Sequence, residues 1–429
     1  MLGKILNTFG TRVISAILNL LIVIAISQLL GPAGKGIQGI LIATIAYILV
    51  FANLMGGGAI VFLTPRFHYA IIIVPAYLWS IITASLFFVA LYFFKLLDPQ
   101  FIIHVCLLSI INAFTSINSS VLIGKEKISA SNIIALIQPF VTIIGLVFFF
   151  YVLDEKSIFS YIFSLYVAFG SSFFVSSYFL KKHAGAFRIG GILEYFAIIK
   201  QMLHYGILNQ LAHIFQLLSF RMSFYWLEQV YSEAEVGVYS NGTSLVESIW
   251  LISRSICMVQ YARISNTSDI KYAQKLTVNL TFAGMVASLF LVLIMVFLPP
   301  ELFTFVFGQG FADVGRVIQS LAPGVLFFNI ALIMGHYFSG IGKYHINTIA
   351  SFAGLIISIL LFAVMIPRFG IFGAGWATSI SYTFTSLVVL LFFIKESKLN
   401  KSEIIPTGKD IYDLFQALRT HLKIKKLGE

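Results

Sequence analysis

Residues 346–366 read INTIASFAGLIISILLFAVMI, an apolar run without an acidic or basic side chain. A helix of about 20 such residues crosses a hydrocarbon core of ~30 Å, so this stretch predicts a transmembrane helix. Pro367 and Arg368 follow it and mark its end. Runs of this kind recur along the chain, and they predict the fold class, an all-α integral membrane protein.

Composition excludes a water-soluble protein of this size. Hydrophobic residues make up 59% of the 429 residues, charged residues make up 10%, and the mean hydropathy is +0.95. A soluble domain carries roughly 25% charged residues. We therefore predict about twelve transmembrane helices, at 5–30, 37–63, 71–97, 101–123, 128–153, 157–180, 201–229, 235–262, 272–298, 314–341, 345–366 and 371–395.

Basic residues give the orientation in the membrane. Of the 28 Lys and Arg residues, 21 fall in inside loops and ends if the N-terminus is cytoplasmic, and only five, Lys35 among them, fall in outside loops. Cytoplasmic loops carry the excess of Lys and Arg. Both termini are therefore predicted to be cytoplasmic, and the net charge of +11 is explained by loops that face anionic lipid.

Short internal matches divide the chain into two halves. Ile-Gly-Lys occurs at 123–125 and at 341–343, and Gly36 and Gly237 each open a similar apolar run. Both matches shift the helices by six, which predicts parallel repeats with a substrate site between them. The predicted parts are an N-lobe (1–180), a cytoplasmic connection (181–200), a C-lobe (201–395) and a basic tail (396–429). The tail is either an amphipathic helix on the inner membrane surface or partly disordered.

Among the charged residues within or near the ends of predicted spans, five stand out: Arg12, Arg66, Arg221, Glu247 and Arg254. Such residues usually face a cavity or a partner. We predict that Arg12, Arg66 and Arg254 form a cationic pocket open to the cytoplasm, because guanidinium groups bind phosphate in a bidentate manner. The alternative is that Arg221 and Glu247 form a structural ion pair and that Arg12 and Arg66 reach to the interface.

Polar side chains gather in the seventh predicted span. Asn209, Gln210 and His213 would line a wet cavity and bind sugar hydroxyls. The alternative is that they only join helices by hydrogen bonds. Cys106 and Cys257 lie in apolar runs, and neither a zinc spacing, a Walker A pattern nor a nucleophile elbow is present in the sequence. We therefore predict no catalytic residue, metal or cofactor, and a protein that is not an enzyme.

Several stretches resemble the Wzx-type polysaccharide flippases, relatives of the MATE exporters and lipid II flippases in the MOP superfamily. The resemblance covers nearly the whole chain, and its most specific block runs from 307 to 379. The stretches are LGPAGKG (30–36), EVGVYS (235–240) continuing to Arg254, FGQGF (307–311), LAPGV (321–325), SGIGK (339–343) and PRFGIFGAGWATS (367–379).

The resemblance implies two six-helix lobes in a V. It implies that the substrate is an oligosaccharide on undecaprenyl pyrophosphate, moved from the inner to the outer leaflet of a bacterial inner membrane. The polysaccharide polymerase machinery would be a candidate partner. The family lines its cavity with cationic residues, and Arg12, Arg66 and Arg254 fit that pattern. Two other functions stay open: a cation-coupled MATE-like exporter of small amphiphiles, and a membrane-embedded enzyme of glycan assembly.

Overall fold

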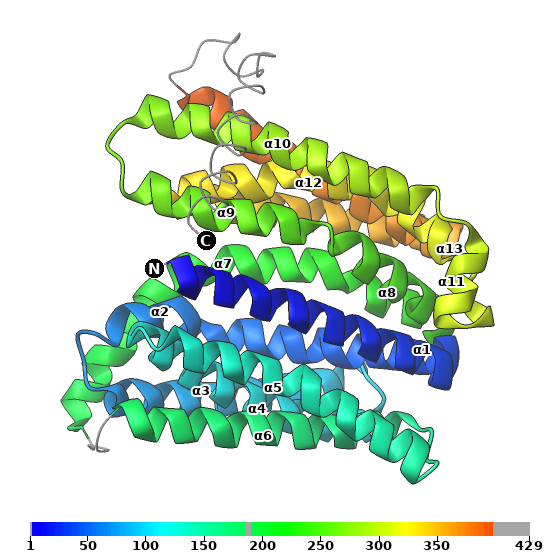
Figure 1. Cartoon of the computed structure of the whole chain (residues 1–429), viewed down its shortest axis with the longest axis horizontal. Coiled ribbons are helices and arrows are strands. Elements are labelled where there is room, and N and C mark those ends of the chain that lie inside the picture. Colours follow the sequence, from blue (N-terminus) through cyan, green and yellow to red (C-terminus); the bar gives the residue numbers. More distant parts are fainter. Residues whose placement is uncertain (1, 185–189, 398–429) are drawn as a thin grey trace, which may run out of the picture. The chain divides into compact units, whose positions relative to one another are not determined.

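The computed structural model describes residues 2–184 and 190–397, and these residues are helical almost throughout, with no β-strand among them. Figure 1 shows the helices, which are α1 (Leu2–Ala52), α2 (Gly57–Leu63), α3 (Tyr69–Phe93), α4 (Pro99–Gly124), α5 (Ile128–Val147), α6 (Ile158–Ala184), α7 (Ile192–Val230), α8 (Glu233–Glu247), α9 (Trp250–Ser265), α10 (Ile270–Val296), α11 (Pro300–Phe307), α12 (Val314–Gly340) and α13 (Tyr344–Glu396). Two short 3₁₀ turns (Asn53–Met55, Gln309–Phe311) and a π-helical turn (Phe148–Val152) complete the helical segments.

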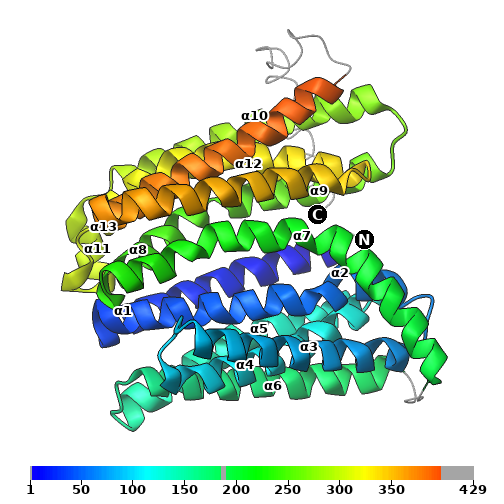
Figure 2. The same cartoon turned by 180° about the vertical axis from the view of Figure 1, so that it is seen from behind.

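The longest elements are α1 and α13. The two predicted spans 345–366 and 371–395 both lie in α13, whereas α1 contains the predicted span 5–30 and only the first part of 37–63. The prediction of one uninterrupted helix over 37–63 is wrong, because a 3₁₀ turn separates α1 from α2. The chain reverses at Gly31 (φ 67°, ψ −171°) and at Gly370 (φ 57°, ψ −137°), so that each element is a pair of helical halves, as both views show (Figures 1 and 2). Only glycine readily adopts this backbone conformation. A proline lies beside each reversal, Pro32 in α1 and Pro367 in α13. The predicted breaks near 31–36 and 367–370 are therefore confirmed.

Eight segments of the described residues are long and apolar enough to cross a membrane. Two of them, Gly10–Leu63 and Tyr344–Glu396, hold two predicted spans each. The predicted seventh and eighth spans correspond to α7, α8 and α9, which are not among the eight. The chain is thus an all-helical membrane protein, and the total of twelve spans and the cytoplasmic position of the termini stay predictions.

Contacts divide the chain into two compact units. Unit 1 comprises Met1–Asn241 with Pro300–Val314, and unit 2 comprises Gly242–Pro299 and the chain from Gly315 onward. The chain thus passes from one unit to the other inside α8. The predicted lobes, 1–180 and 201–395, stay a prediction, and most of the predicted tail lies outside the described residues.

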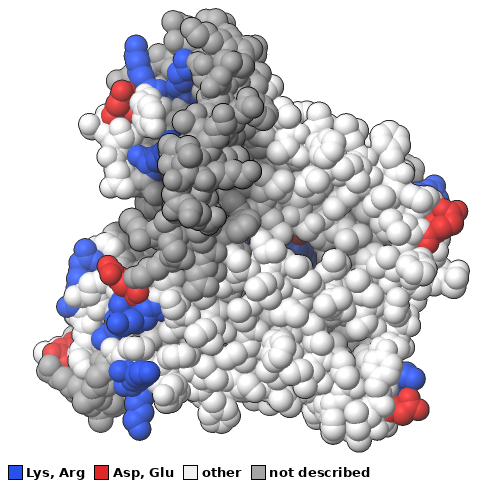
Figure 3. All heavy atoms as spheres, viewed as in Figure 1, with Lys and Arg blue, Asp and Glu red and all other residues white. Residues whose placement is uncertain are grey.

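Each unit has its own apolar core. In unit 1, Ile60, Leu63 and Val121 pack with Ile72 and Met202 and are almost fully buried. On the face of unit 1 in Figure 3, charged side chains gather near the two ends, and the surface between them is largely free of charge. That distribution suits helices whose middle faces hydrocarbon.

In unit 2, the helices α9, α10, α12 and α13 meet in a second core. Phe338 and Ile346 are fully buried there, and Ala273, Tyr337 and Phe393 pack beside them.

Candidate functional site

Two of the predicted pocket arginines lie in unit 1, and both are exposed. Arg12 projects from the first half of α1, and Arg66 lies in the turn after α2. The Arg66 guanidinium stacks over the Phe62 ring, 3.7 Å from its centroid, and its Nη1 donates to the Phe62 carbonyl oxygen at 2.6 Å. Arg66 is therefore held by its own turn, and the rest of its donors stay open to an anion.

The third pocket arginine, Arg254, lies in unit 2 on α9 and is also exposed. Among the described residues, none of Arg12, Arg66 and Arg254 forms an ion pair. Each guanidinium is therefore available to a phosphate. The pocket that would join all three stays a prediction.

Glu247 marks a break in the predicted eighth span. We predicted one helix over 235–262, but α8 ends at Glu247 and α9 begins at Trp250. The amides of Ser248 and Ile249 bond to the carbonyls of Leu245 and Val246, three residues back, so the turn is tightened. The prediction of an uninterrupted span is wrong here, and Glu247 and Arg254 are not separated by two regular α-helical turns.

The Glu247 carboxylate has a partner on α13 in unit 2. The Tyr382 hydroxyl donates to Glu247 Oε1 at 3.0 Å. The Tyr382 ring packs against Trp250 and Phe328, with centroids 5.5 Å and 5.1 Å away, and Trp250 Nε1 donates to the Val325 carbonyl at 3.0 Å. An aromatic cluster thus fixes the carboxylate at the helix break. Broken helices at membrane depth commonly line binding sites.

The remaining predicted site residues lie on α7 in unit 1. Arg221 is half-buried, with its guanidinium carbon 5.5 Å from the centroid of the Phe224 ring. Gln210 Nε2 donates to the Val50 carbonyl of α1 at 3.3 Å, and His213 is exposed. The side chain of Asn209 lies outside the described residues. The predicted Arg221–Glu247 pair would join units 1 and 2, and it stays a prediction.

Other polar groups of the spans join helices within one unit. Asn118 accepts from the Tyr77 hydroxyl at 2.6 Å and donates to Ser176 at 3.0 Å, and Asn329 accepts from Ser253 and Ser288. These asparagines are fully buried. Asn118 and Asn329 therefore join helices by hydrogen bonds.

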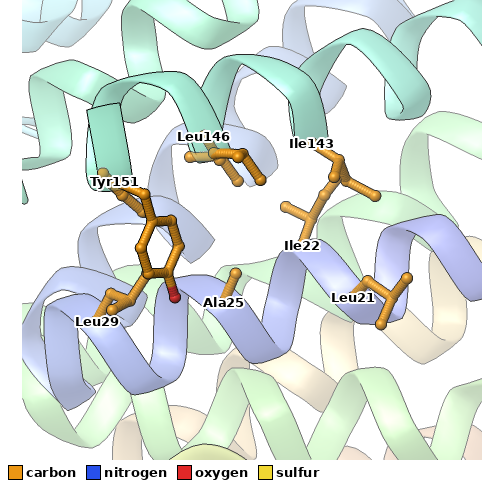
Figure 4. A pocket seen from close by; sticks show the side chains of 9 residues that line it. Leu21, Ile22, Ala25, Leu29, Ile143, Leu146 and Tyr151 are labelled. Carbon is orange, nitrogen blue, oxygen red and sulfur yellow. The ribbon is translucent and has the colours of Figure 1, made fainter. Parts of the chain in front are cut away.

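An apolar groove lies between α1 and α5 in unit 1. Leu21, Ala25 and Leu29 of α1 face Ile143 and Leu146 of α5 across it, with Tyr151 of the π-helical turn at one end (Figure 4). A π-helical turn is locally wider than an α-helix. It follows α5 directly and forms one end of the groove. The groove has almost no polar lining, so it suits hydrocarbon and not a sugar or a phosphate.

Sequence reasoning placed Lys35 in an outside loop, and the structure corrects this. Its side chain is 2% exposed, and its amine donates to Gln38 and Ser240. The signal that could have found it is the run of small residues around it, Gly34, Gly36 and Gly39, which permits helices to approach and enclose a long side chain. Among the described residues, no group of three or more His, Cys, Asp or Glu side chains could hold a metal ion.

Comparison with solved structures decides the fold. An inward-facing multidrug resistance MATE transporter matches with a TM-score of 0.70 and 15% identity, over 89% of this chain and 94% of that one. The lipid II flippase MurJ matches with a TM-score of 0.64 and 16% identity, over 97% and 92%. The chain has the fold of the MOP superfamily transporters. The predicted MATE-like fold is thereby confirmed, and the absence of enzymatic activity stays a prediction.

The MOP fold also occurs in a transporter from Pyrococcus furiosus, which matches with a TM-score of 0.61 and 13% identity over 91% of this chain and 95% of that one. That protein is described as having a binding pocket of reverse polarity. The chain matches no protein-family model. In sequence it is 25% identical over 174 residues to the capsular polysaccharide biosynthesis protein CapF of Staphylococcus aureus, and the match spans 39% of this chain and 43% of CapF.

Proposed function

We propose that this protein moves an undecaprenyl-pyrophosphate-linked oligosaccharide from the inner to the outer leaflet of a bacterial cytoplasmic membrane, by alternating access. The observation that carries the proposal is the likeness to CapF, a capsular polysaccharide biosynthesis protein, in a chain with the MOP fold. Like the flippase MurJ, the chain has a fold that could accept a lipid-linked substrate.

The charges support an anionic substrate. Arg12, Arg66 and Arg254 keep their guanidinium groups exposed. A pyrophosphate offers paired oxygens that match the fork of a guanidinium. In the proposed cycle, these arginines capture the pyrophosphate from the inner leaflet, and the glycan enters a polar cavity that Gln210 and His213 would line.

The lipid tail needs an apolar path. It is long and uncharged, so it stays in hydrocarbon while the glycan crosses. The groove between α1 and α5, lined by Leu21, Ala25 and Leu146, is one apolar surface of unit 1 that lipid chains would contact.

The test is complementation in a bacterium that lacks its own capsule flippase. The wild-type chain should restore surface glycan, measured with a glycan-specific antibody, and should clear lipid-linked repeat units from the cytoplasmic leaflet. Arg254→Ala should lower surface glycan at least tenfold, while Arg254→Lys keeps part of it. Arg263→Ala, on the same helix α9, is the matched control and should behave as wild type.

Two results would contradict the proposal. If the expressed wild-type chain restores surface glycan in none of the tested pathways, the proposed function is wrong. If Arg254→Ala is expressed normally and gives normal surface glycan, only the proposed role of Arg254 is wrong.

A cation-coupled exporter of small amphiphiles is the second candidate. It is favoured by the TM-score of 0.70 to a multidrug MATE transporter, against 0.64 to MurJ. Overexpression would then raise the resistance of a drug-sensitive strain to cationic dyes, and deletion in the native host would leave surface glycan unchanged.

A further inference from the structure

Unit 1 contains a lysine amine that is closed off from water. Lys35 lies just beyond the reversal at Gly31, and its side chain is 2% exposed. Its Nζ donates to Gln38 Oε1 at 2.6 Å and to Ser240 Oγ at 3.1 Å, and Gln38 in turn donates to the Tyr161 hydroxyl at 3.3 Å. Gln38, Ser240 and Tyr161 are buried as well.

The hydrogen bonds around Nζ match a neutral amine. Within the described residues the amine has two acceptors, one on Gln38 and one on Ser240. A neutral amine carries two N–H groups, and both are satisfied. An ammonium carries three, and its third N–H would be buried without a partner, together with the full charge. Burial of an unpaired charge is among the costliest arrangements in a protein interior.

The charged groups that face Lys35 do not neutralise an ammonium. Arg221 of α7 adds a like charge, and Tyr161 of α6 contributes a hydroxyl through Gln38. The first turn of α8 carries Glu233 and Glu235, whose charged neighbours are Asp98 and Asp313. Lys35 forms no ion pair with a described residue.

The amine lies where α1 meets the start of α8. A Cβ on Gly36 would lie 1.8 Å from the Glu233 carbonyl oxygen, and one on Gly237 would lie 2.0 Å from that of Pro32. Beside this backbone contact, the Lys35 amine donates a hydrogen bond to Ser240 of α8. The chain leaves unit 1 at the next residue, Asn241. The hydrogen bond from Lys35 therefore reaches α8 close to the point where the chain leaves unit 1.

We propose that Lys35 is a proton-binding site, at which a proton is taken up when the contact between α1 and α8 opens and is released when it closes. The inference goes beyond the proposed function, because it concerns the coupling ion and holds for any substrate.

The proton balance is simple. In the closed contact, Nζ has two hydrogens and a lone pair. When α8 moves from α1 and water enters, the lone pair accepts a proton from hydronium, which leaves as water. The ammonium stays in water, where its charge is solvated. To close the contact again, Nζ returns the proton to water, so one proton accompanies each opening and closing.

The first test measures thermal stability of the detergent-purified protein between pH 6 and pH 9.5. If the closed contact holds a neutral amine, folding releases a proton here, so the wild type should gain stability relative to Lys35→Met as pH rises. Lys35→Met should have the higher Tm at pH 6, and the difference should shrink or reverse by pH 9.5. Lys156→Met changes an exposed lysine paired with Asp154, and should follow the wild type.

The second test measures hydrogen exchange of the segment 233–241, corrected for the intrinsic pH dependence of exchange. Protection of the wild type should fall at low pH, and that of Lys35→Met should not change. Lys35→Arg, which stays charged, should exchange fast at every pH. Lys35→Gln, whose amide also has two N–H groups, replaces Lys35→Met if the latter does not fold.

Identical pH profiles of the wild type and Lys35→Met, in either measurement, would overturn the proposal. So would a Lys35→Arg protein as protected as the wild type at neutral pH. Neither measurement uses the transported substrate, so these results are independent of the success or failure of the flippase assay.

Discussion

Gly36 and Gly237 face each other so closely that a Cβ added to either one would lie 3.1 Å from the backbone nitrogen of the other. The two glycines are the residues that the sequence matched as equivalent positions of an internal repeat. The two members of the predicted repeat are therefore in contact within unit 1, where α1 meets α8. Backbones approach this closely only where side chains are absent.

We expect Gly36→Ala and Gly237→Ala to lower Tm and the yield of folded protein strongly. The added methyl group would meet backbone carbonyl oxygens at 1.8 Å and 2.0 Å, and overpacking costs about 1–3 kcal/mol or more. Gly170→Ala in α6 is the control, because a Cβ there meets nothing within 4 Å. Wild-type Tm for Gly237→Ala would contradict the close contact.

The reversals in α1 and α13 make a second prediction. Gly31 (φ 67°, ψ −171°) and Gly370 (φ 57°, ψ −137°) both have positive φ. This backbone conformation costs residues other than glycine about 1–3 kcal/mol. We expect Ala at either position to lower the Tm of the purified protein. Asn should not rescue it, because Asn favours a different left-handed region. Full stability of Gly370→Asn would argue against this conformation.

The Tyr382–Glu247 hydrogen bond can be tested by a double-mutant cycle. Hydrogen bonds to charged groups contribute about 1.5–3 kcal/mol. We expect Tyr382→Phe and Glu247→Gln each to lower stability, and the double variant to lose less than the sum of the two. Denaturation of the four purified proteins measures this coupling. Strict additivity would mean that the hydroxyl does not support the carboxylate.

Glu233, in the first turn of α8, provides a pH prediction. Burial raises the pKa of Glu233, and the nearby Asp98 carboxylate raises it further. The folded protein therefore holds this proton to higher pH than the unfolded chain does. Stability from this group is present at acidic pH and is lost as pH rises through the folded pKa.

We expect Glu233→Gln to gain Tm relative to the wild type as pH increases from about 4.5 toward neutrality. Asp98→Asn should reduce that gain, although it also alters the cap at Gln100, where Asp98 accepts from the backbone amide. A Tm difference between wild type and Glu233→Gln that is constant with pH would exclude the effect.

The phosphate-binding role of Arg66 can be separated from its local packing. Phe62→Leu removes the ring under the guanidinium but keeps the charge, whereas Arg66→Ala removes the charge. If Arg66 binds the substrate pyrophosphate, Arg66→Ala should lower surface glycan in the complementation assay much more than Phe62→Leu. Equal losses would indicate that the residue acts through the packing of its turn.

The sequence by itself determined the class of the protein and most of its helix boundaries. Apolar runs of ~20 residues have few alternatives to a membrane span, and residues such as Gly31 and Pro367 end them by their own backbone geometry. The charged residues in spans were found for the same reason, because a charge in hydrocarbon stands out in the sequence alone.

Only the tertiary structure decided which polar groups are enclosed and by what. Lys35 looked like a loop lysine, but Gly36 and Gly237 bring α8 against α1 and bury its amine. The break at Glu247 was also hidden, because the tightened turn at Ser248 and Ile249 follows no proline or glycine. Burial and helix register depend on contacts between segments distant in the chain, and local sequence patterns do not record those contacts.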